Sequence, residues 1–357
     1  MIRRSALALF AVLAIVLGYV VVASPTGALI DGAVVVPNPN TGSDSNVLNS
    51  VSCVTVSSCI AVGTYYSGSS EQTLVLQWDG ASWTKLDSPN SGSDNNFLYS
   101  VSCVTVSSCF AVGSYLNGSV YQTLVLKWDG TSWTKLDSPN PGPWNGTNGL
   151  SSVSCVTVSS CFAVGSYSNG SVYQSLVLQW DGASWMKLDS PSPGTNGNGL
   201  GSVSCVSVSS CIAVGNYNDG SVNQSLVLSW DGASWTKPDS PNPGSGDNVL
   251  ISVSCVTTTL CVAVGYDYIG SANATLLVQW DGTSWTKLDS PSPGSIDNSL
   301  NSVSCVSASS CIAVGYYFTG SVAPTLLMSL TGPEPPTTTT TPPTTTSSDP
   351  VAPAFTG

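Results

Sequence analysis

The sequence predicts an all-β protein, and three observations lead to that prediction. First, the motif S-V-S-C recurs six times at intervals of 50 or 52 residues, and such a fixed period is typical of stacked or radial repeats. Second, every copy contains short runs rich in Val, Leu, Trp, Tyr and Thr, separated by turn residues. Third, no segment combines helical spacing with capping residues. Six units of four antiparallel strands over residues 29–332 predict a six-bladed β-propeller.

The second copy shows the four expected strands of a blade. They are Leu98–Val104, Cys109–Tyr115, Gln122–Trp128 and Ser132–Leu136. The last two are joined by an Asp-Gly turn, where glycine accepts the positive φ that a tight turn requires. The Ala-Val-Gly run of the second strand is apolar on both faces, so we expect it to be buried between blades. A Trp stands on either side of the Asp-Gly turn in five copies, and we expect these pairs to be wedges between blades.

The two ends of the repeat array complete each other. The sixth copy stops at Thr331-Gly332, before its fourth strand. The segment Asp31–Pro39 resembles the missing piece, because it carries an Asp-Gly pair, an apolar run and Pro-Asn-Pro. We therefore expect the N-terminal strand to close the last blade, which leaves no blade unpaired between the first and last repeats.

Residues 1–28 and 333–357 fall outside the predicted propeller. The first segment places two arginines before an apolar run from Ala6 to Ala23, which is the order of a secretory signal peptide. The same run is long enough for an uncleaved N-terminal anchor, the one membrane contact that we expect. Both alternatives predict a secreted or cell-surface protein. Residues 333–357 are dominated by Pro and Thr, which predicts a disordered tail.

The 12 cysteines form six C-x5-C pairs. In a secreted chain this pattern indicates one disulfide in each repeat, across the first hairpin. Free buried thiols and metal ligation are the alternatives, but each pair would leave a metal two ligands short. We expect no metal and no cofactor. The expected pairs are Cys53–Cys59, Cys103–Cys109, Cys155–Cys161, Cys205–Cys211, Cys255–Cys261 and Cys305–Cys311.

The composition excludes several classes of function. The chain has no His, which rules out a Ser-His-Asp triad and a Cys-His dyad. A net charge of -12 makes a nucleic-acid partner unfavourable. No acidic pair stands outside the repeats, as a glycoside hydrolase would need. We therefore expect no catalytic residues, a protein that is not an enzyme, and a monomer.

The repeated segment Trp-Asp-Gly-x-Ser-Trp resembles segments of known propeller families. The units resemble kelch-like and Asp-box-like blades and the W-D-G repeats of propeller lectins, over residues 29–332. The Asp-box spacing has one residue more than Asp79–Trp83, and the kelch double glycine is absent. The resemblance implies a propeller architecture. For the W-D-G lectins it also implies an alternative role for the Trp residues, stacking on sugar rings at blade junctions.

Function is expected on the face where the copies differ. Alternate loops of an up-and-down meander share a face, so the nearly identical Cys loops and Asp-Gly turns lie together. The loop after the second strand and the inter-blade connection form the other, variable face. Such polar loops on a rigid scaffold are the usual binding surface, although their Asn, Asp and Gly can be turn formers alone. The candidate ligand-binding residues are Tyr65, Tyr115, Tyr167, Tyr217, Tyr317, Asp94, Asn95, Trp144, Asp247 and Asp297.

Together these observations favour a secreted or cell-surface, non-catalytic binding module. The expected ligand is a carbohydrate or cell-envelope polymer, because Tyr, Trp, Asn and Asp offer flat apolar faces and short hydrogen-bonding groups. Six similar units could add weak contacts into a large avidity. The alternative is a structural or adhesion protein that binds a cell-surface protein. A propeller glycoside hydrolase or lyase is the less favoured alternative.

Overall fold

A computed structural model describes residues 39, 45–92, 94–143 and 146–330. In this part of the chain every regular element is a β-strand, so the predicted all-β class is confirmed. These residues include no helix that is long and apolar enough to cross a membrane. The predicted signal or anchor at 1–28 and the predicted tail at 333–357 lie outside the described residues.

The strands form successive antiparallel sheets, numbered here from 1 in chain order. Sheet 1 contains β1 (Asn46–Thr55), β2 (Ser58–Ser67), β3 (Ser70–Trp78) and β4 (Trp83–Leu86). Sheet 2 contains β5 (Asn96–Thr105), β6 (Ser108–Asn117), β7 (Val120–Trp128) and β8 (Trp133–Leu136). Sheet 3 contains β9 (Asn148–Thr157), β10 (Ser160–Ser168), β11 (Tyr173–Trp180) and β12 (Trp185–Leu188).

Two further four-stranded sheets and one three-stranded sheet follow. Sheet 4 contains β13 (Gly197–Ser207), β14 (Ser210–Asn218), β15 (Asn223–Trp230) and β16 (Trp235–Thr236). Sheet 5 contains β17 (Asn248–Thr257), β18 (Leu260–Ile269), β19 (Ala272–Trp280) and β20 (Trp285–Leu288). Sheet 6 contains β21 (Asp297–Ser307), β22 (Ser310–Phe318) and β23 (Thr325–Leu330).

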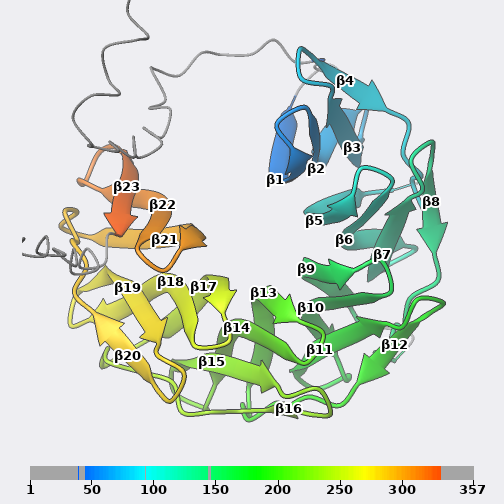
Figure 1. Cartoon of the computed structure of the whole chain (residues 1–357). Helices are drawn as coiled ribbons and strands as arrows, with labels where there is room; N and C mark the ends of the chain where they lie inside the picture. The colour runs from blue at the N-terminus through cyan, green and yellow to red at the C-terminus, as the bar shows by residue number, and fades with distance from the viewer. Residues whose placement is uncertain (1–38, 40–44, 93, 144–145, 331–357) are drawn as a thin grey trace, which may run out of the picture. The chain divides into compact units, whose positions relative to one another are not determined.

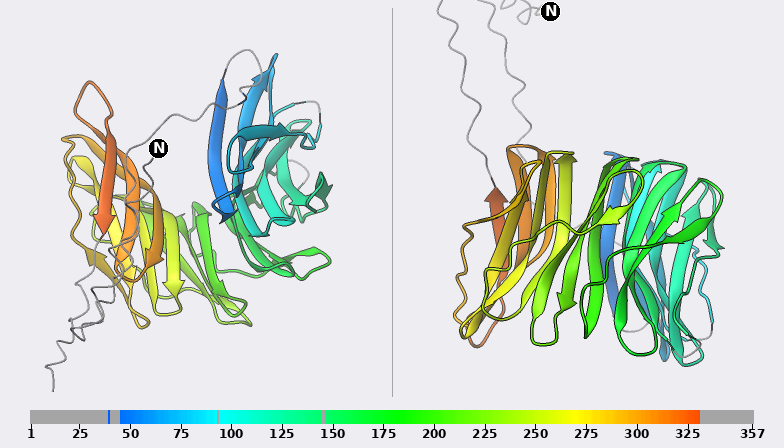
Figure 2. Two further views of the ribbon diagram at one scale, coloured as in Figure 1. Left: turned by 45° about the horizontal axis from the view of Figure 1, so that its top comes forward. Right: turned by 90° about the horizontal axis from the view of Figure 1, so that it is seen from below.

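Each sheet is a simple meander in which consecutive strands pair. Figure 1 shows the sheets following one another in chain order around a central space, with their first strands innermost. The side views in Figure 2 show the strands of each sheet running between the same two faces. The predicted closure of the last blade depends on residues 31–39, of which only Pro39 is described, so that closure stays a prediction.

The hydrophobic core consists of layers between neighbouring sheets. At the first junction, Ile60 and Val62 of β2 pack against Leu98 of β5 and against Trp128 and Trp133 of sheet 2. The same arrangement recurs at the next three junctions, and at the fifth junction Leu326 and Met328 of β23 pack in a layer that contains no Trp. Burying one such aliphatic side chain contributes about 1.5–3 kcal/mol. The expected burial of the Ala-Val-Gly run between sheets is therefore confirmed in sheets 1 to 5. Four of the five Trp pairs lie between sheets as expected, whereas Trp83 packs against its own sheet.

The glycine of the Ala-Val-Gly run is required by a close backbone approach. A Cβ atom on Gly113 would collide with the backbone oxygen of Phe97 on the paired strand β5. The register shifts between Leu98 and Ser100, and this irregularity brings the two backbones together. The glycine at the same place in each of the other sheets meets the same obstruction.

The serines of S-V-S-C connect the innermost strands of neighbouring sheets. Ser100 Oγ accepts a hydrogen bond from the Val153 amide at 3.1 Å, and Ser102 Oγ accepts one from the Cys155 amide at 3.0 Å. Equivalent pairs of bonds occur at the other four junctions. The first strands of neighbouring sheets belong to different sheets and do not pair, so a serine hydroxyl accepts from each of these amides in place of a backbone carbonyl.

The six expected disulfides are confirmed. In each sheet the paired cysteines face each other across the first hairpin, as Cys103 and Cys109 do. The remaining five bridges repeat this arrangement. Six disulfides fit an oxidising, extracellular environment.

Candidate functional site

The Asp-Gly turns are locally satisfied structures. Asp129 Oδ1 accepts the backbone amides of Thr131 and Ser132, both at 2.8 Å. The Ser132 amide, the Thr131 hydroxyl and the Thr131 amide together lower the pKa of Asp129 to about 2. The other four turns use the same bonds to a lowered-pKa aspartate. On the face that carries the Asp-Gly turns, each repeated carboxylate therefore stabilises its own turn.

The structure places the five candidate tyrosines in five different sheets and does not bring them together. Tyr115 is buried, donates its hydroxyl to Gln122 Oε1 at 2.7 Å, and has Lys135 Nζ 4.3 Å from its ring centroid. Tyr65, Tyr167 and Tyr217 lie under the lysine of their own sheet in the same way. Tyr317 packs against the core between sheets 5 and 6. Four of these tyrosines therefore contact a lysine of their own sheet, and the fifth, Tyr317, packs between two sheets.

Three of the candidate ligand-binding residues in or beside the inter-sheet connections, Asn95, Asp247 and Asp297, accept hydrogen bonds from the preceding sheet. Asn95 Oδ1 accepts the Glu71 amide at 3.0 Å, and Asp247 Oδ1 accepts the Asn223 amide at 2.8 Å. Asp297 Oδ1 accepts from Asn273 Nδ2 at 2.8 Å, and its Oδ2 accepts from the Tyr316 hydroxyl at 3.0 Å. The backbone oxygen of Asp94 accepts from the Asn96 side chain at 2.7 Å. Trp144 lies outside the described residues.

A buried asparagine at the start of the first strand of sheets 2 to 6 organises the connection that precedes it, and the sequence analysis did not predict this role. Asn198 Oδ1 accepts the Gly194 amide at 2.7 Å, and its Nδ2 donates to the Gly194 and Tyr173 carbonyls at 3.1 Å. The signal was an Asn that stands two residues before the Leu of each first strand. Its members are Asn46, Asn96, Asn148, Asn198, Asn248 and Asn298.

Two adjoining hollows lie on the variable face, over sheets 2, 3 and 4. The first, of about 500 Å³, lies between sheets 2 and 3. The second, of about 470 Å³, lies between sheets 3 and 4. Both are lined by Ser166 and Tyr173 of sheet 3, so the two hollows adjoin each other on either side of these residues. We call this surface the groove.

The end of the groove at sheet 2 is aromatic. Phe97 and Tyr99 of β5 stack with their ring planes 7° apart and their centroids 5.8 Å apart. Tyr121 of β7 lies 6.0 Å from Phe97, centroid to centroid. Partial burial raises the pKa of Tyr99, as do the nearby Tyr121 and Glu71, against a hydrogen bond with Ser114 that lowers it. At neutral pH the hydroxyl is protonated and can donate a hydrogen bond.

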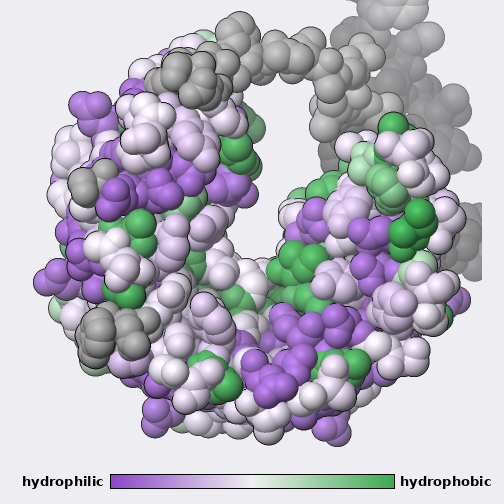
Figure 3. Space-filling view, turned by 180° about the vertical axis from the view of Figure 1, so that it is seen from behind, coloured by the Kyte–Doolittle hydropathy of each residue, from purple (hydrophilic) through white to green (hydrophobic). Residues whose placement is uncertain are grey.

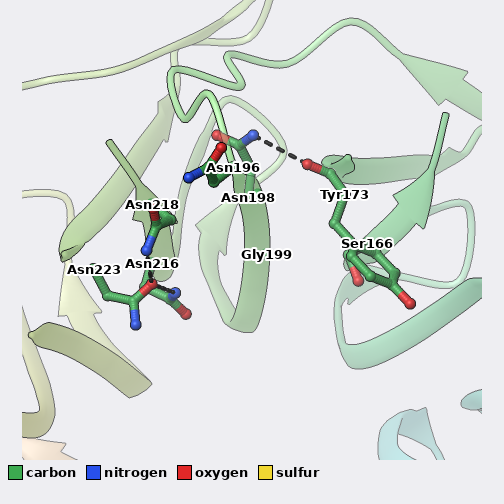
Figure 4. Close-up of a pocket in the computed structure, with 9 residues that line it drawn as sticks. Ser166, Tyr173, Asn196, Asn198, Gly199, Asn216, Asn218 and Asn223 are labelled. Atoms are coloured by element: carbon green, nitrogen blue, oxygen red, sulfur yellow. Dashed lines mark hydrogen bonds between the residues drawn. The ribbon is translucent and has the colours of Figure 1, made fainter. Parts of the chain in front are cut away.

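The end of the groove at sheet 4 is lined by amides. Figure 4 shows Asn196, Asn198, Asn216, Asn218 and Asn223 around this hollow, with Tyr173 across from them. Asn216 Nδ2 donates to Asn223 Oδ1 at 3.2 Å, which fixes the orientation of both side chains. None of the residues that line the two hollows is charged.

Glycines on the first strands open the groove between its two ends. Phe97 occupies this position in sheet 2 and Val249 in sheet 5, whereas sheets 3 and 4 have Gly149 and Gly199. A Cβ atom on Gly199 would meet no atom within 4 Å, so the space above it is empty. The aromatic cluster and these glycines do not recur in all copies, which separates the groove from the repeated scaffold.

Two other hollows on the Asp-Gly side lie between sheets 1 and 2 and between sheets 4 and 5. Both are lined by the second Trp of a pair and by the connection that leaves the preceding sheet, such as Trp133 with Ser88 and Pro89. Their residues are those that build every junction, so the groove remains the more specific candidate.

Comparisons with known proteins agree on the fold. No protein-family model and no curated protein matches the chain. A Hadza microbial sialidase is similar at a TM-score of 0.51 and 11% identity, over 74% of this chain and 62% of the sialidase. The GH74 xyloglucanase from Xanthomonas campestris is similar at 0.52 and 12% identity, over 80% of this chain and 47% of the xyloglucanase.

The chain therefore spans less than two thirds of the length of either neighbour. Both neighbours support the β-propeller fold, and at this identity the likeness carries the fold alone. The kelch-like and Asp-box-like resemblance is not confirmed by them.

One prediction from the sequence is corrected by these neighbours. We expected a protein that is not an enzyme, yet a sialidase and a xyloglucanase, both enzymes, share its fold. That expectation was wrong, because it took the repetition of the carboxylates as an argument against catalysis in general. The scaffold is one on which enzymes are built.

Proposed function

We propose that the protein binds carbohydrate in the groove, outside the cell. The observation that carries this proposal is the union, in one uncharged groove, of aromatic ring faces at sheet 2 with side-chain amides at sheet 4. The C–H faces of a pyranose ring pack on aromatic rings, while its hydroxyls pair with amide donors and acceptors. A concave site with apolar walls and a few oriented polar groups is typical of ligand pockets.

The charge of the groove further defines the ligand. No lysine lines either hollow, and Glu71 is close enough to affect the pKa of Tyr99. An acidic polysaccharide would find no cation there, so the groove suits a neutral glycan. Its extent over three sheets suits several consecutive sugar rings rather than a single one.

The same proposal includes secretion and a closed six-bladed ring. Six disulfides support an extracellular location. A closed ring would hold the angle between sheets 2, 3 and 4, and therefore the width of the groove.

The test is a glycan and cell-wall polysaccharide array, probed with the oxidised, folded protein. We expect binding to one class of neutral glycan that the free sugar competes away. The variant Tyr99→Ala/Tyr173→Ala should lose this binding, because it removes the exposed ring faces of the groove. Tyr268→Ala in sheet 5 is the matched control, since Tyr268 is 38% exposed against 40% for Tyr99 and 47% for Tyr173.

A blank array with folded protein, or equal binding by the groove variant, would refute the proposal. Release of reducing sugar from any bound glycan is measured on the same samples, which decides whether the groove also cleaves its ligand.

A further inference from the structure

Sheet 4 differs from its neighbours at three positions of the groove. Its residues there are Gly199 on β13, Asn216 on β14 and Asn223 on β15. Gly199 is paired with Asn216, and Asn223 is paired with Asn218, so these positions lie on one side of the sheet. The equivalent positions hold Phe97, Ser114 and Tyr121 in sheet 2, Gly149, Ser166 and Tyr173 in sheet 3, and Val249, Tyr266 and Asn273 in sheet 5. Sheet 4 therefore combines a glycine with two carboxamides.

Hydrogen bonds between the carboxamides of sheet 4 fix which of their atoms remain free. Asn223 Oδ1 accepts from Asn216 Nδ2 at 3.2 Å and from Asn218 Nδ2 at 3.4 Å. Among the described residues, no group bonds to Asn216 Oδ1 or to Asn223 Nδ2, so one acceptor and one donor remain free. Figure 4 shows the Asn216 and Asn223 side chains next to each other at the hollow, and Figure 3 shows hydrophilic surface where sheet 4 lies, at the bottom of the view.

The equivalent asparagine of sheet 5 has no such free donor directed by its neighbours. Asn273 Nδ2 donates to Asp297 Oδ1 at 2.8 Å. The corresponding carboxylate beside sheet 4 is Asp247, and its Oδ1 accepts the backbone amide of Asn223 instead, at 2.8 Å. The side-chain donor of Asn223 is therefore left for water or for a ligand. A half-buried polar group of this kind gains free energy when a partner satisfies it.

A small apolar recess adjoins the two carboxamides. Gly199 lies opposite Asn216 on the paired strand, and a Cβ atom on Gly199 would meet no atom within 4 Å. Gly197, two residues earlier on the same side of β13, is equally open. Both glycines line the hollow of about 470 Å³ between sheets 3 and 4. Backbone Cα–H groups therefore form the floor beside the free acceptor, with room above them for a methyl group.

An acetamido group has the chemistry that complements these features together. Its carbonyl oxygen accepts a hydrogen bond, which Asn223 Nδ2 can donate, and its N–H donates one, which Asn216 Oδ1 can accept. Its methyl group is small and apolar and suits the recess above Gly199. A sugar hydroxyl at the same place can pair with the polar atoms, but it leaves the recess to water. The hollow at sheet 4 therefore favours an acetamido group over a hydroxyl.

We propose that the hollow at sheet 4 is a subsite for the acetamido group of an N-acetylated sugar, and that the aromatic hollow at sheet 2 stacks the next ring of the same glycan. Ser166 and Tyr173 line both hollows, so the two rings lie on either side of these residues. This assignment rests on the proposed binding of carbohydrate in the groove. It narrows the ligand from neutral glycans in general to N-acetylated ones.

Pairs of glycans that differ only in this group test the assignment by isothermal titration calorimetry. The probes are chito-oligosaccharides against cello-oligosaccharides of equal length, and N-acetylgalactosamine against galactose. We expect the N-acetylated member of a pair to bind about tenfold more tightly, because it adds hydrogen bonds and buries its methyl group. Equal affinities within a pair that binds, or binding confined to glycans without the group, would overturn the assignment. If that binding is still lost in Tyr99→Ala/Tyr173→Ala, the proposed function stands, whereas no binding to any glycan overturns both.

Two substitutions test the two halves of the subsite. Asn223→Asp keeps the oxygen that accepts from Asn216 but removes the free donor, so it should abolish the preference for the N-acetylated member. Asn117→Asp adds the same charge at the hairpin between β6 and β7, outside both hollows, and is the matched control that should keep the preference. Gly199→Val introduces the residue of sheet 5 without a steric clash, so Tm should be kept while the filled recess abolishes the preference. An unchanged preference in Asn223→Asp or in Gly199→Val would overturn the assignment.

Discussion

Among the residues that the structure describes, sheet 5 alone contains an ion pair with a fully buried carboxylate, and removing its lysine should lower the free energy of unfolding. Asp267 replaces the tyrosine found at this place in the other sheets and is fully buried. Lys287 Nζ lies 2.8 Å from its Oδ2, and Oδ1 has no hydrogen-bond partner within the described residues. The variant Lys287→Met keeps the length of the side chain but leaves the carboxylate without its cation.

The magnitude follows from this geometry. Breaking a buried ion pair from one side costs about 3–5 kcal/mol, and the lower end applies because the Lys287 side chain is partly open to water. At about 2 °C per kcal/mol, Tm should fall by about 6 °C. The matched control is Lys135→Met in sheet 2, where the lysine lies over the neutral ring of Tyr115. Lys135 Nζ also donates to the Tyr115 hydroxyl at 3.2 Å, and a cation–π contact on a buried ring is worth about 2 kcal/mol, so that variant should lose about 4 °C.

Differential scanning calorimetry of both variants at neutral pH is the assay. The double variant Asp267→Tyr/Lys287→Met should recover most of the lost Tm. It removes the buried carboxylate that has no cation and restores the tyrosine that the other sheets have at this place. Equal effects of Lys287→Met and Lys135→Met would refute the reasoning, since they would show that Asp267 does not depend on its cation.

Two further predictions concern the repeated elements. The pKa of Asp129 is lowered to about 2 from 3.8, so the stability that its turn contributes is present above pH 4 and is lost as pH falls toward 2. NMR titration of this carboxyl group checks the value, and in Asp129→Asn the pH dependence from this turn should vanish. Replacing Cys103 and Cys109 together by Ala should cost about 2.4 kcal/mol in the loop-entropy account of a seven-residue ring. Calorimetry under oxidising conditions measures that cost, and an unchanged Tm would contradict it.

The scaffold could be predicted from the sequence because each of its devices is repeated. The Cys pairs, the Trp pairs and the Ala-Val-Gly run recur at one period, and the structure places them at the hairpins and junctions that the period implies. The same repetition did not help to choose the residues of the functional site. We selected Tyr115 and its equivalents as loop residues, but β6 continues to Asn117, so Tyr115 lies within a strand and packs inside the protein.

The groove was not predicted, because its residues are exceptions to the repeat. Phe97 and Tyr99 belong to sheet 2 alone, Tyr121 recurs only as Tyr173 of sheet 3, and Gly149 and Gly199 contribute through the space that they leave. Sequence comparison between copies reveals these differences, but the meeting of sheets 2, 3 and 4 at one face requires the fold. Both hollows of the groove lie on the variable face, and the assignment of that face as the binding surface stays a prediction.

The measurement that tests carbohydrate binding in the groove most directly is ligand-dependent stabilisation. A ligand at about 100 times its Kd stabilises the native protein by about 2.7 kcal/mol, so a saturating neutral oligosaccharide should raise Tm of the wild type and of Tyr268→Ala alike. The same oligosaccharide should leave Tm of Tyr99→Ala/Tyr173→Ala unchanged. An equal rise in the groove variant, or no rise with any neutral glycan, would contradict the account.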